Sequence, residues 1–444
     1  MIVWRLLLLV TLTVWLNQSV SVNRYGELRD RIERGEASWT LTVQQPFLFA
    51  YRRAYDEELY CALSGAMLGR PIDHERLRSV RAHSNAHFER APPPADGRWH
   101  APYREIALEY PPLVIPWLLL PRLWFDDFTG YARAFSASMG IVLWLAVELV
   151  ASLWRSPQMK RRVFVCAWLS VLAHGSIAVQ RLDALVAFTL ALALWAWQRK
   201  RPGLLGIALG LGAALKLLPA LWLLPVLAFD PTLRARRVLL GFACALGLGL
   251  LPLAWWDPAG TMFAYHAGRG LHAESVAASV LAALVYPFAP VARAVATFGA
   301  YHVQDTRADA IAMVLPVVLM AVLLAWCLWG RRRRARGVQG RAAVLTVSVG
   351  IVLVCGKVLS PQYLTWIVPL VGALPHRGAL RRCSALWWIA ALILSQVYLR
   401  AYFDAVYMMR PLGIATLLAR DVCVLLAMVC CARADCVRTR RLVR

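Results

Sequence analysis

Long apolar runs, separated by short basic connectors, recur from one end of the 444-residue chain to the other. Many are near 20 residues long, and a helix of about that length spans the roughly 30 Å hydrocarbon core of a bilayer. The first run, residues 2–20, could be a signal peptide. No small-x-small cleavage site follows it clearly, so we interpret it as an uncleaved span. The pattern predicts an all-α, polytopic membrane protein with one integral membrane domain over residues 1–444.

Roughly 11–13 transmembrane or re-entrant helices are expected. After the first run, crossings are expected at 134–154, 163–179, 184–198, 203–229, 237–256, 308–330, 342–359, 362–375, 383–400 and 411–431. Segment 203–229 begins and ends at basic connectors, so it must cross out and back as a broken pair of helices at Pro219 and Pro225. The stretch 275–305 begins and ends on the outer side, so we expect it to dip into the membrane or lie in the interface.

The formal net charge of +24 invites a nucleic-acid interpretation, but the position of the charges favours another. Six short segments carry 24 Lys and Arg residues: 155–162, 198–201, 234–237, 331–341, 376–382 and 433–444. Short Lys/Arg-rich loops mark the cytoplasmic side of a membrane protein. Residues 21–109, by contrast, hold 13 Arg and 13 Asp or Glu. We therefore place loops 21–133 and 257–274 outside the cytoplasm, interpret 432–444 as a basic cytoplasmic tail, and expect no nucleic-acid partner.

The composition agrees with this class. The chain is 60% hydrophobic with a mean hydropathy of +0.55, more apolar than a typical soluble domain. Most of the ten cysteines lie in apolar runs or at the cytoplasmic ends, and only Cys61 lies in the long outer loop. Neither a disulfide framework nor a zinc site is therefore predicted.

One apolar run is too short to cross. Residues 111–125, "PPLVIPWLLLPRLWF", hold four prolines and lie between two points on the outer side, so we expect a re-entrant or interfacial helix. Irregular backbone at such depth is tolerated only against protein or a wet cavity. Glu109 and Tyr110, which precede this run, should therefore face a cavity. No convincing internal repeat is visible, which disfavours an inverted-repeat transporter.

Ionisable residues gather on the outer side. Asp56, Glu57 and Glu58 form the first turn of a weakly amphipathic helix, whose positive end suits acids. The alternative is that they are helix-start charges on a solvated face. Arg181 and Asp183 stand between two spans. They are either an ordinary loop pair or, because burial of charge at membrane depth is costly, functional residues.

Lysine is rare, with four residues against 45 Arg. Lys216 and Lys357 lie among apolar residues, so they either snorkel to the interface or hold a phosphate. The second outer loop and the later "SPQY" break add further polar candidates: His266, Arg269, Glu274, Ser275, Gln362 and Tyr363. Glycines beside Arg269, ahead of a helix, suit an anionic headgroup, and a merely polar loop is the alternative.

Four segments occur in a recognisable order: "YDEELYCALSGAMLGRPID" with "PYREIALEYPPL", then "QRLDALVAF" leading to "LGAALKLLPALWLLP", then "YHAGRGLHAESVAASV", then "SPQYLTWIVPL". Together they resemble GT-C-type integral-membrane glycosyltransferases, most closely the bacterial polyprenol-phosphate-mannose-dependent α-mannosyltransferases. The resemblance extends over about residues 1–375 and implies a GT-C-like fold. Residues 70–101 are longer and more polar than that pattern, which makes them candidates for acceptor choice.

The resemblance implies a hexosyltransferase of the cell envelope that moves mannose from a polyprenyl-phosphate donor to an acceptor hydroxyl. The reaction would take place on the extracytoplasmic face of the cell membrane, with inversion. Asp56 matches the general base, and Glu57 or Glu58 are alternatives for that role. The implied substrate-binding residues are Glu57, Glu109, Tyr110, Arg181, Asp183, Lys216, His266, Arg269, Glu274, Ser275, Lys357, Gln362 and Tyr363. The expected partners are the donor, a glycolipid or polysaccharide acceptor and membrane lipid. No cofactor is expected, and one acid-rich turn does not indicate a divalent metal.

Two other classes stay open at this point. A polytopic transporter or lipid flippase would explain the many helices and the intramembrane lysines, and it predicts charges along a path through the membrane. A catalytically inert scaffold would leave the outer acids dispensable. The residues name neither the sugar, which could be mannose, glucose or arabinose, nor the acceptor.

Overall fold

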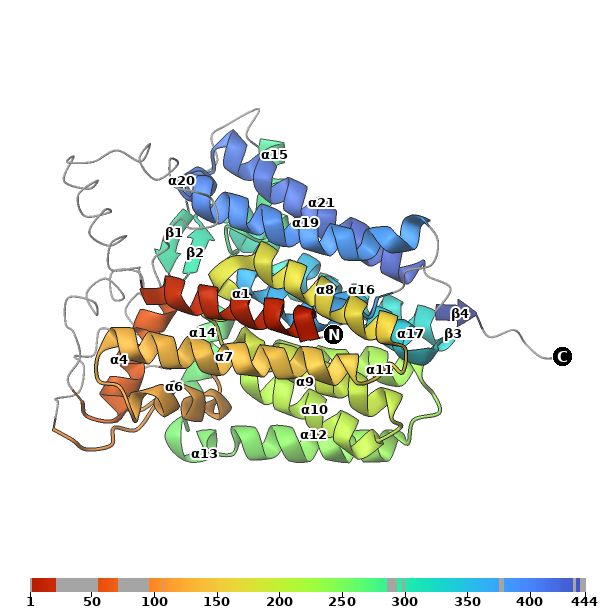
Figure 1. Ribbon diagram of the computed structural model, residues 1–444. Helices are drawn as coiled ribbons and strands as arrows, with labels where there is room; N and C mark the ends of the chain where they lie inside the picture. Colours follow the sequence, from red (N-terminus) through yellow and green to blue (C-terminus); the bar gives the residue numbers. More distant parts are fainter. Residues whose placement is uncertain are drawn as a thin grey trace.

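Long helices lying side by side make up most of the computed structural model, which describes residues 2–20, 55–70, 96–106, 108–285, 294–297, 300–374, 379–433 and 437–439 (Figure 1). The expected outer-loop segments 21–54 and 71–95, and most of the tail after 433, lie outside these residues. The helices of the first half are α1 (Ile2–Val20), α4 (Tyr55–Met67), α6 (Ile115–Arg122), α7 (Phe128–Ala151), α8 (Pro157–His174), α9 (Asp183–Gln198), α10 (Pro202–Lys216) and α11 (Leu223–Phe229). Those of the second half are α12 (Ala235–Leu250), α13 (Leu253–Trp256), α14 (Thr261–Gly268), α15 (Val276–Val285), α16 (Thr306–Arg331), α17 (Gly337–Cys355), α18 (Val368–Val371), α19 (Ala379–Ala401), α20 (Phe403–Tyr407) and α21 (Pro411–Ala432).

Five described helices are long and apolar enough to cross a bilayer: α7, α12 continued by α13, α16, α17 and α21. Shorter apolar helices, including those at 183–198 and 202–216, fill the space between them. This confirms the all-α, polytopic membrane architecture expected from the hydropathy pattern. The run after Tyr110 is also short, as expected: η3 (Pro112–Val114) and α6 together reach only Arg122.

Helix α9 lies at the centre of the bundle. It packs against α7, α10, α17 and the 3₁₀ helix η6 (Pro361–Ile367), and most of its residues are buried. A helix that is apolar on every side belongs in a core. The polar exception is Asp183 in its first turn, which is 2% exposed. The central helix α9 therefore places the buried carboxylate of Asp183 at one end of the bundle.

Two glycines allow α10 and α12 to approach closely. A Cβ added to Gly206 would overlap the carbonyl oxygen of Val238, and one added to Gly241 would overlap that of Gly203. Without side chains at these positions, the two backbones pack in direct contact, as small residues permit in membrane helices. This brings the end of α10, with Lys216, against the rest of the bundle.

The two ends of the bundle differ. Figure 1 shows α4, α6, α13, α14 and the hairpin of β1 (Ala294–Thr297) and β2 (Ala300–Val303) at one end, with β3 (Arg333–Ala335) and β4 (Val437–Thr439) at the other. At the β3 end, Arg341 hydrogen-bonds Gln198 and lies 3.4 Å from Asp230, so three basic connectors meet there. The described parts of the outer loops predicted from the charge pattern, including α4, α6 and α14, lie at the opposite end (Figure 1).

Two features differ from the expected elements. The described chain holds two antiparallel strand pairs, the hairpin β1–β2 and the long-range pair β3–β4. The apolar pattern did not indicate them because each strand has only three or four residues. The expected crossing at 362–375 begins as η6 and continues as the short α18, since Pro369 supplies no N–H for a continuous helical ladder. Segment 203–229 forms α10, the 3₁₀ helix η5 (Leu218–Trp222) and α11, as expected for a broken pair.

Candidate active site

The first polar contact joins the start of α4 to the turn before α9. Asp56 forms an ion pair with Arg181, and the two side chains are 15% and 9% exposed. The neighbouring Glu57 is fully buried and accepts a hydrogen bond from Ser136 Oγ of α7 at 2.6 Å. The adjacent acids therefore have different surroundings: Asp56 is held by a cation at the bundle end, and Glu57 is held against α7.

Asp183, two residues beyond Arg181, anchors a second contact. Lys216 Nζ lies 2.7 and 2.9 Å from its two carboxylate oxygens, and Trp366 Nε1 donates to Oδ1 at 2.6 Å. The ammonium also lies 4.4 Å from the ring centroid of Tyr363, which stacks on Trp366. Lys216 therefore does not snorkel away from the core; it neutralises the carboxylate at the start of α9.

Glu109 and Arg269 connect the two outer loops. Arg269 Nη2 lies 2.8 Å from Glu109 Oε2 and 3.3 Å from the Tyr265 hydroxyl. His266 Nε2 donates to the carbonyl oxygen of Glu109 at 2.9 Å. Burial lowers the pKa of His266, and the neighbouring Arg269 and Lys216 charges lower it further, so the imidazole is neutral at pH 7. Glu109 is thus held at two points: Arg269 binds its carboxylate, and His266 binds its backbone carbonyl.

Tyr60 and Tyr110 connect these groups. Their hydroxyl oxygens lie 3.2 Å apart, and Tyr110 also accepts a hydrogen bond at its carbonyl from the hydroxyl of Tyr103. Burial raises the pKa of Tyr60, and the charges of Asp183 and Glu109 raise it further. The hydroxyl of Tyr60 therefore stays protonated between the segments that carry these two acids.

Lys357 differs from the other cations. It follows α17, and its Nζ donates to the carbonyl oxygens of Arg269 and Ala267 at 2.7 and 3.0 Å. Burial lowers its pKa, as does the positive charge of Arg269. Across the described residues, each of the other site cations contacts a carboxylate, whereas the hydrogen bonds of Lys357 go to neutral carbonyls. Lys357 is therefore the site cation whose contacts with the described residues leave its charge unpaired with a carboxylate.

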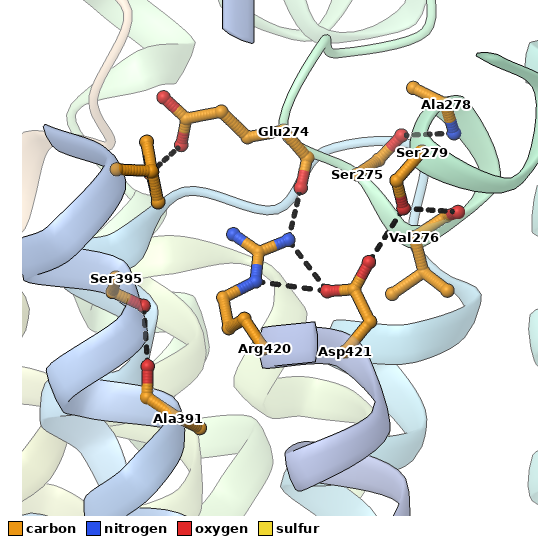
Figure 2. Close-up of polar contacts among 10 residues, drawn as sticks. Glu274, Ser275, Val276, Ala278, Ser279, Ala391, Ser395, Arg420 and Asp421 are labelled. Carbon is orange, nitrogen blue, oxygen red and sulfur yellow. Dashed lines mark hydrogen bonds and ion pairs between the residues drawn. The ribbon is translucent and has the colours of Figure 1, made fainter. Parts of the chain in front are cut away.

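The remaining predicted residues lie elsewhere or at the edge. Gln362 accepts a hydrogen bond from Ser360 beside Tyr363. Figure 2 shows Glu274 and Ser275 in a separate cluster between α15 and α21, where the Glu274 carbonyl accepts from Arg420 and Ser275 Oγ accepts from the Ala278 amide. The structure thus brings most of the predicted residues into one group, and it places Glu274 and Ser275 in another.

Trp366 and Arg420 were missed by the sequence reasoning. Trp366 follows "SPQY" by three residues but looks like an ordinary apolar residue of that run. Arg420 and Asp421 carried a detectable signal, since a charged pair inside the apolar run 411–431 is costly unless it has a role. In the parts of the chain that are described, no three His, Cys, Asp or Glu side chains are grouped so as to hold a metal ion.

Residues 108–361 match a sequence family described as glycosyltransferase family 87. The chain belongs to glycosyltransferase family 87. This is a family of integral-membrane glycosyltransferases of the GT-C type, which confirms the expected resemblance and fold class. Searches among curated proteins and among solved structures found no match.

Family 87 membership makes the chain a membrane glycosyltransferase that acts on a sugar donor and an acceptor. The transporter and scaffold interpretations lose their support. The matched region includes Glu109, Asp183, Arg269 and Lys357, whereas Asp56 precedes it. Five apolar helices agree with a multi-pass membrane protein.

Proposed function

We propose that this family 87 protein transfers mannose from a polyprenyl-phosphate donor to an acceptor hydroxyl on the extracytoplasmic face, with inversion at the anomeric carbon. The observation that carries the proposal is the meeting of Asp56, Glu109 and Asp183 with their cations at one end of the bundle. The basic connectors meet at the other end. By the positive-inside rule, the polar end then faces away from the cytoplasm.

A lipid-linked donor fits this placement. Nucleotide sugars are charged and are made in the cytoplasm, whereas a polyprenyl phosphate keeps its activated sugar at the membrane surface. The short η3–α6 segment begins at Pro112, two residues after Tyr110. Leu120 near its end is exposed, as are Leu123 and Trp124 directly after it. Apolar and aromatic side chains at this level suit contact with lipid.

The departing phosphate needs positive charge that is not already neutralised. Lys357 supplies it, and Arg269 lies beside it, because Lys357 binds the Arg269 carbonyl directly. Fixed cations stabilise negative charge as it develops on a leaving group, and they do so more strongly where water is excluded. His266, neutral and donating to Glu109, holds the same loop in place.

Asp56 is the proposed general base. Its carboxylate takes the proton of the acceptor hydroxyl while that oxygen forms a bond to the anomeric carbon. The bond from that carbon to the phosphate oxygen breaks, and its electron pair leaves with the polyprenyl phosphate. Attack opposite the leaving group inverts the configuration. Pairing with Arg181 keeps Asp56 ionised and fixes its position.

The test is transfer by purified protein from radiolabelled polyprenyl-phosphate mannose to an envelope glycolipid. Asp56→Asn should lower kcat about 10²- to 10⁴-fold, the usual contribution of a positioned base. Asp126→Asn, on an exposed carboxylate of the same outer loop, is the matched control and should stay near the wild type. Full activity of Asp56→Asn would remove this residue from the mechanism. Faster transfer from the glucose or arabinose donor would reassign the sugar.

A further inference from the structure

The loop between α14 and α15, residues 269–275, carries the phosphate-side Arg269 at its start and Glu274 near its end. Lys357 holds the start through the Arg269 carbonyl, and its own carbonyl accepts from the His272 amide at 3.0 Å. The middle pairs with β2: the Ala273 amide donates to the Tyr301 carbonyl at 2.9 Å. What holds the far end of the loop lies in the C-terminal helices.

Arg420 of α21 donates from Nη2 to the Glu274 carbonyl at 2.5 Å, and from Nε and Nη2 to Asp421 Oδ1 at 2.9 and 2.7 Å (Figure 2). The other oxygen of Asp421 accepts from Ser279 Oγ, in the first turn of α15, at 2.6 Å. Arg420 is fully buried and Asp421 is 2% exposed. The pair therefore binds the chain on both sides of the start of α15, at Glu274 in the loop and at Ser279 in the helix.

The Glu274 side chain is held from the same helices. Tyr398 of α19 donates to Oε2 at 2.7 Å, and Tyr407 of α20 donates to Oε1. The ring of Tyr407 also packs on that of Tyr301, with centroids 4.0 Å apart. Since Tyr301 belongs to β2, the C-terminal helices contact both the loop and the neighbouring β1–β2 hairpin.

Burying the charges of Arg420 and Asp421 among the helices costs free energy of folding. Burying a guanidinium and carboxylates costs more than their attraction returns unless the geometry is well satisfied, and apolar residues would anchor α21 as well. Here Arg420 donates to a backbone carbonyl of the loop that carries Arg269, and Asp421 accepts from Ser279 just after that loop. We infer that Arg420 and Asp421 are positioning residues, which set the place of Arg269 through residues 269–275. This inference rests on the proposed function, in which Arg269 serves the donor phosphate.

The test uses the double variant Arg420→Met with Asp421→Asn, which removes both charges so that neither is left buried alone. A displacement of about 1 Å costs roughly 100-fold in rate, so kcat/KM for the donor should fall by about that factor. The matched control is Ser384→Ala, which removes an α19–α21 hydrogen bond to the Ala427 carbonyl away from the loop. Its kcat/KM should stay within about twofold of the wild type, because this buried contact lies away from the loop and is not coupled to Arg269.

A mutant cycle with Arg269→Gln separates positioning from general damage. If Arg420 and Asp421 act through Arg269, adding their substitutions to Arg269→Gln should cause no further loss. Losses that multiply, or a double variant as active as the wild type, would overturn the inference while leaving the proposed function standing. An Arg269→Gln variant with full activity would overturn it too, together with the phosphate role of Arg269.

If the double variant does not fold, Tyr398→Phe replaces it in the same cycle. It removes one hydrogen bond to Glu274 and keeps the ring. We expect roughly a tenfold loss of kcat/KM, the equivalent of about one hydrogen bond to a charged group, and again no further loss on Arg269→Gln. An additive loss here counts against the inference in the same way.

Discussion

Arg269 and Glu109 stand 160 positions apart in the chain, yet Nη2 of one lies 2.8 Å from Oε2 of the other, and their side chains are 12% and 13% exposed. Each belongs to a different outer loop. The pair therefore closes the bundle end by joining the loop before α6 to the loop after α14.

Removing one partner of this pair should destabilise the protein. Glu109→Gln leaves a largely buried guanidinium without its counter-charge, and the expected cost is about 3 kcal/mol of unfolding free energy. Thermal unfolding in detergent measures it. Glu109→Gln combined with Arg269→Gln should be less destabilised than the sum of the single variants, and a strictly additive result would show that the pair is not coupled.

Lys357 is expected to serve the donor rather than the fold. Lys357→Met should raise the KM for the polyprenyl-phosphate donor about 10- to 100-fold, because a hydrogen bond between charged groups is lost. Steady-state kinetics at saturating acceptor measure this. Lys160→Met, in a basic connector at the far end, is the control and should leave the KM unchanged. Equal effects of both variants would contradict the assignment.

His100 should make the stability of the 96–106 segment depend on pH. The Glu105 and Asp96 carboxylates accept hydrogen bonds from His100 Nδ1 and Nε2 at 2.7 and 3.1 Å. The bond to Glu105 raises the pKa of His100 above 6.5, and the bond to Asp96 raises it too. A raised pKa means that the folded state binds the proton more tightly. The stabilisation is complete below about pH 6.5 and is lost as the pH rises through the raised pKa. Unfolding of wild type and His100→Gln should differ most in acid and converge in base; a constant difference would exclude the linkage.

The contact between α10 and α12 should not tolerate a methyl group. Gly206→Ala would press on the Val238 carbonyl, and overpacking of this kind costs about 1–3 kcal/mol. On the same helix, a Cβ at Gly203 meets open space. Gly203→Ala should therefore be neutral or slightly stabilising, because alanine favours the helix. Thermal melting of the two variants side by side decides the matter, and similar losses would refute the close-contact explanation.

The orientation of the bundle has a direct test. Reporter fusions at residues 90 and 335 should report opposite sides of the membrane, with residue 335 cytoplasmic, because the basic connectors meet near β3. A fusion at residue 200, in the basic connector 198–201, is the control and should report the same side as residue 335. If the fusions at residues 90 and 335 both reported the cytoplasm, the proposed extracytoplasmic position of the site would be wrong.

The helical architecture could be predicted because it depends on run length and on the side chosen by basic residues. The short helix after Tyr110 followed from its prolines and from the need to stay on one side. The two strand pairs could not be predicted, since three- or four-residue strands leave no periodic signal. Their pairing depends on which segments the packed helices bring side by side.

The candidate site was predictable as a set of residue types and not as a set of pairs. Asp183 and Lys357 stood out because charge is rare beside apolar runs, whereas Asp56 was distinguished from its two acidic neighbours only by the family resemblance. That Asp183 binds Lys216 while Asp56 binds Arg181 depends on how α4, α9 and α10 pack, which no local pattern encodes. Glu274 lies in the same short loop as Arg269, but its carboxylate accepts hydrogen bonds from Tyr398 of α19 and Tyr407 of α20.

Arg181 and Asp183 are separated by a single residue, and they contact different helices: the first meets α4, and the second meets α10 and Trp366. Leu182 lies in the turn that leads into α9 and sets the spacing of the two charges. Deleting Leu182 would therefore swing one charge away from its counterpart, whereas lengthening either outer loop would leave both in place. Related chains can be expected to vary freely in loop length and to hold the spacing of this one turn constant.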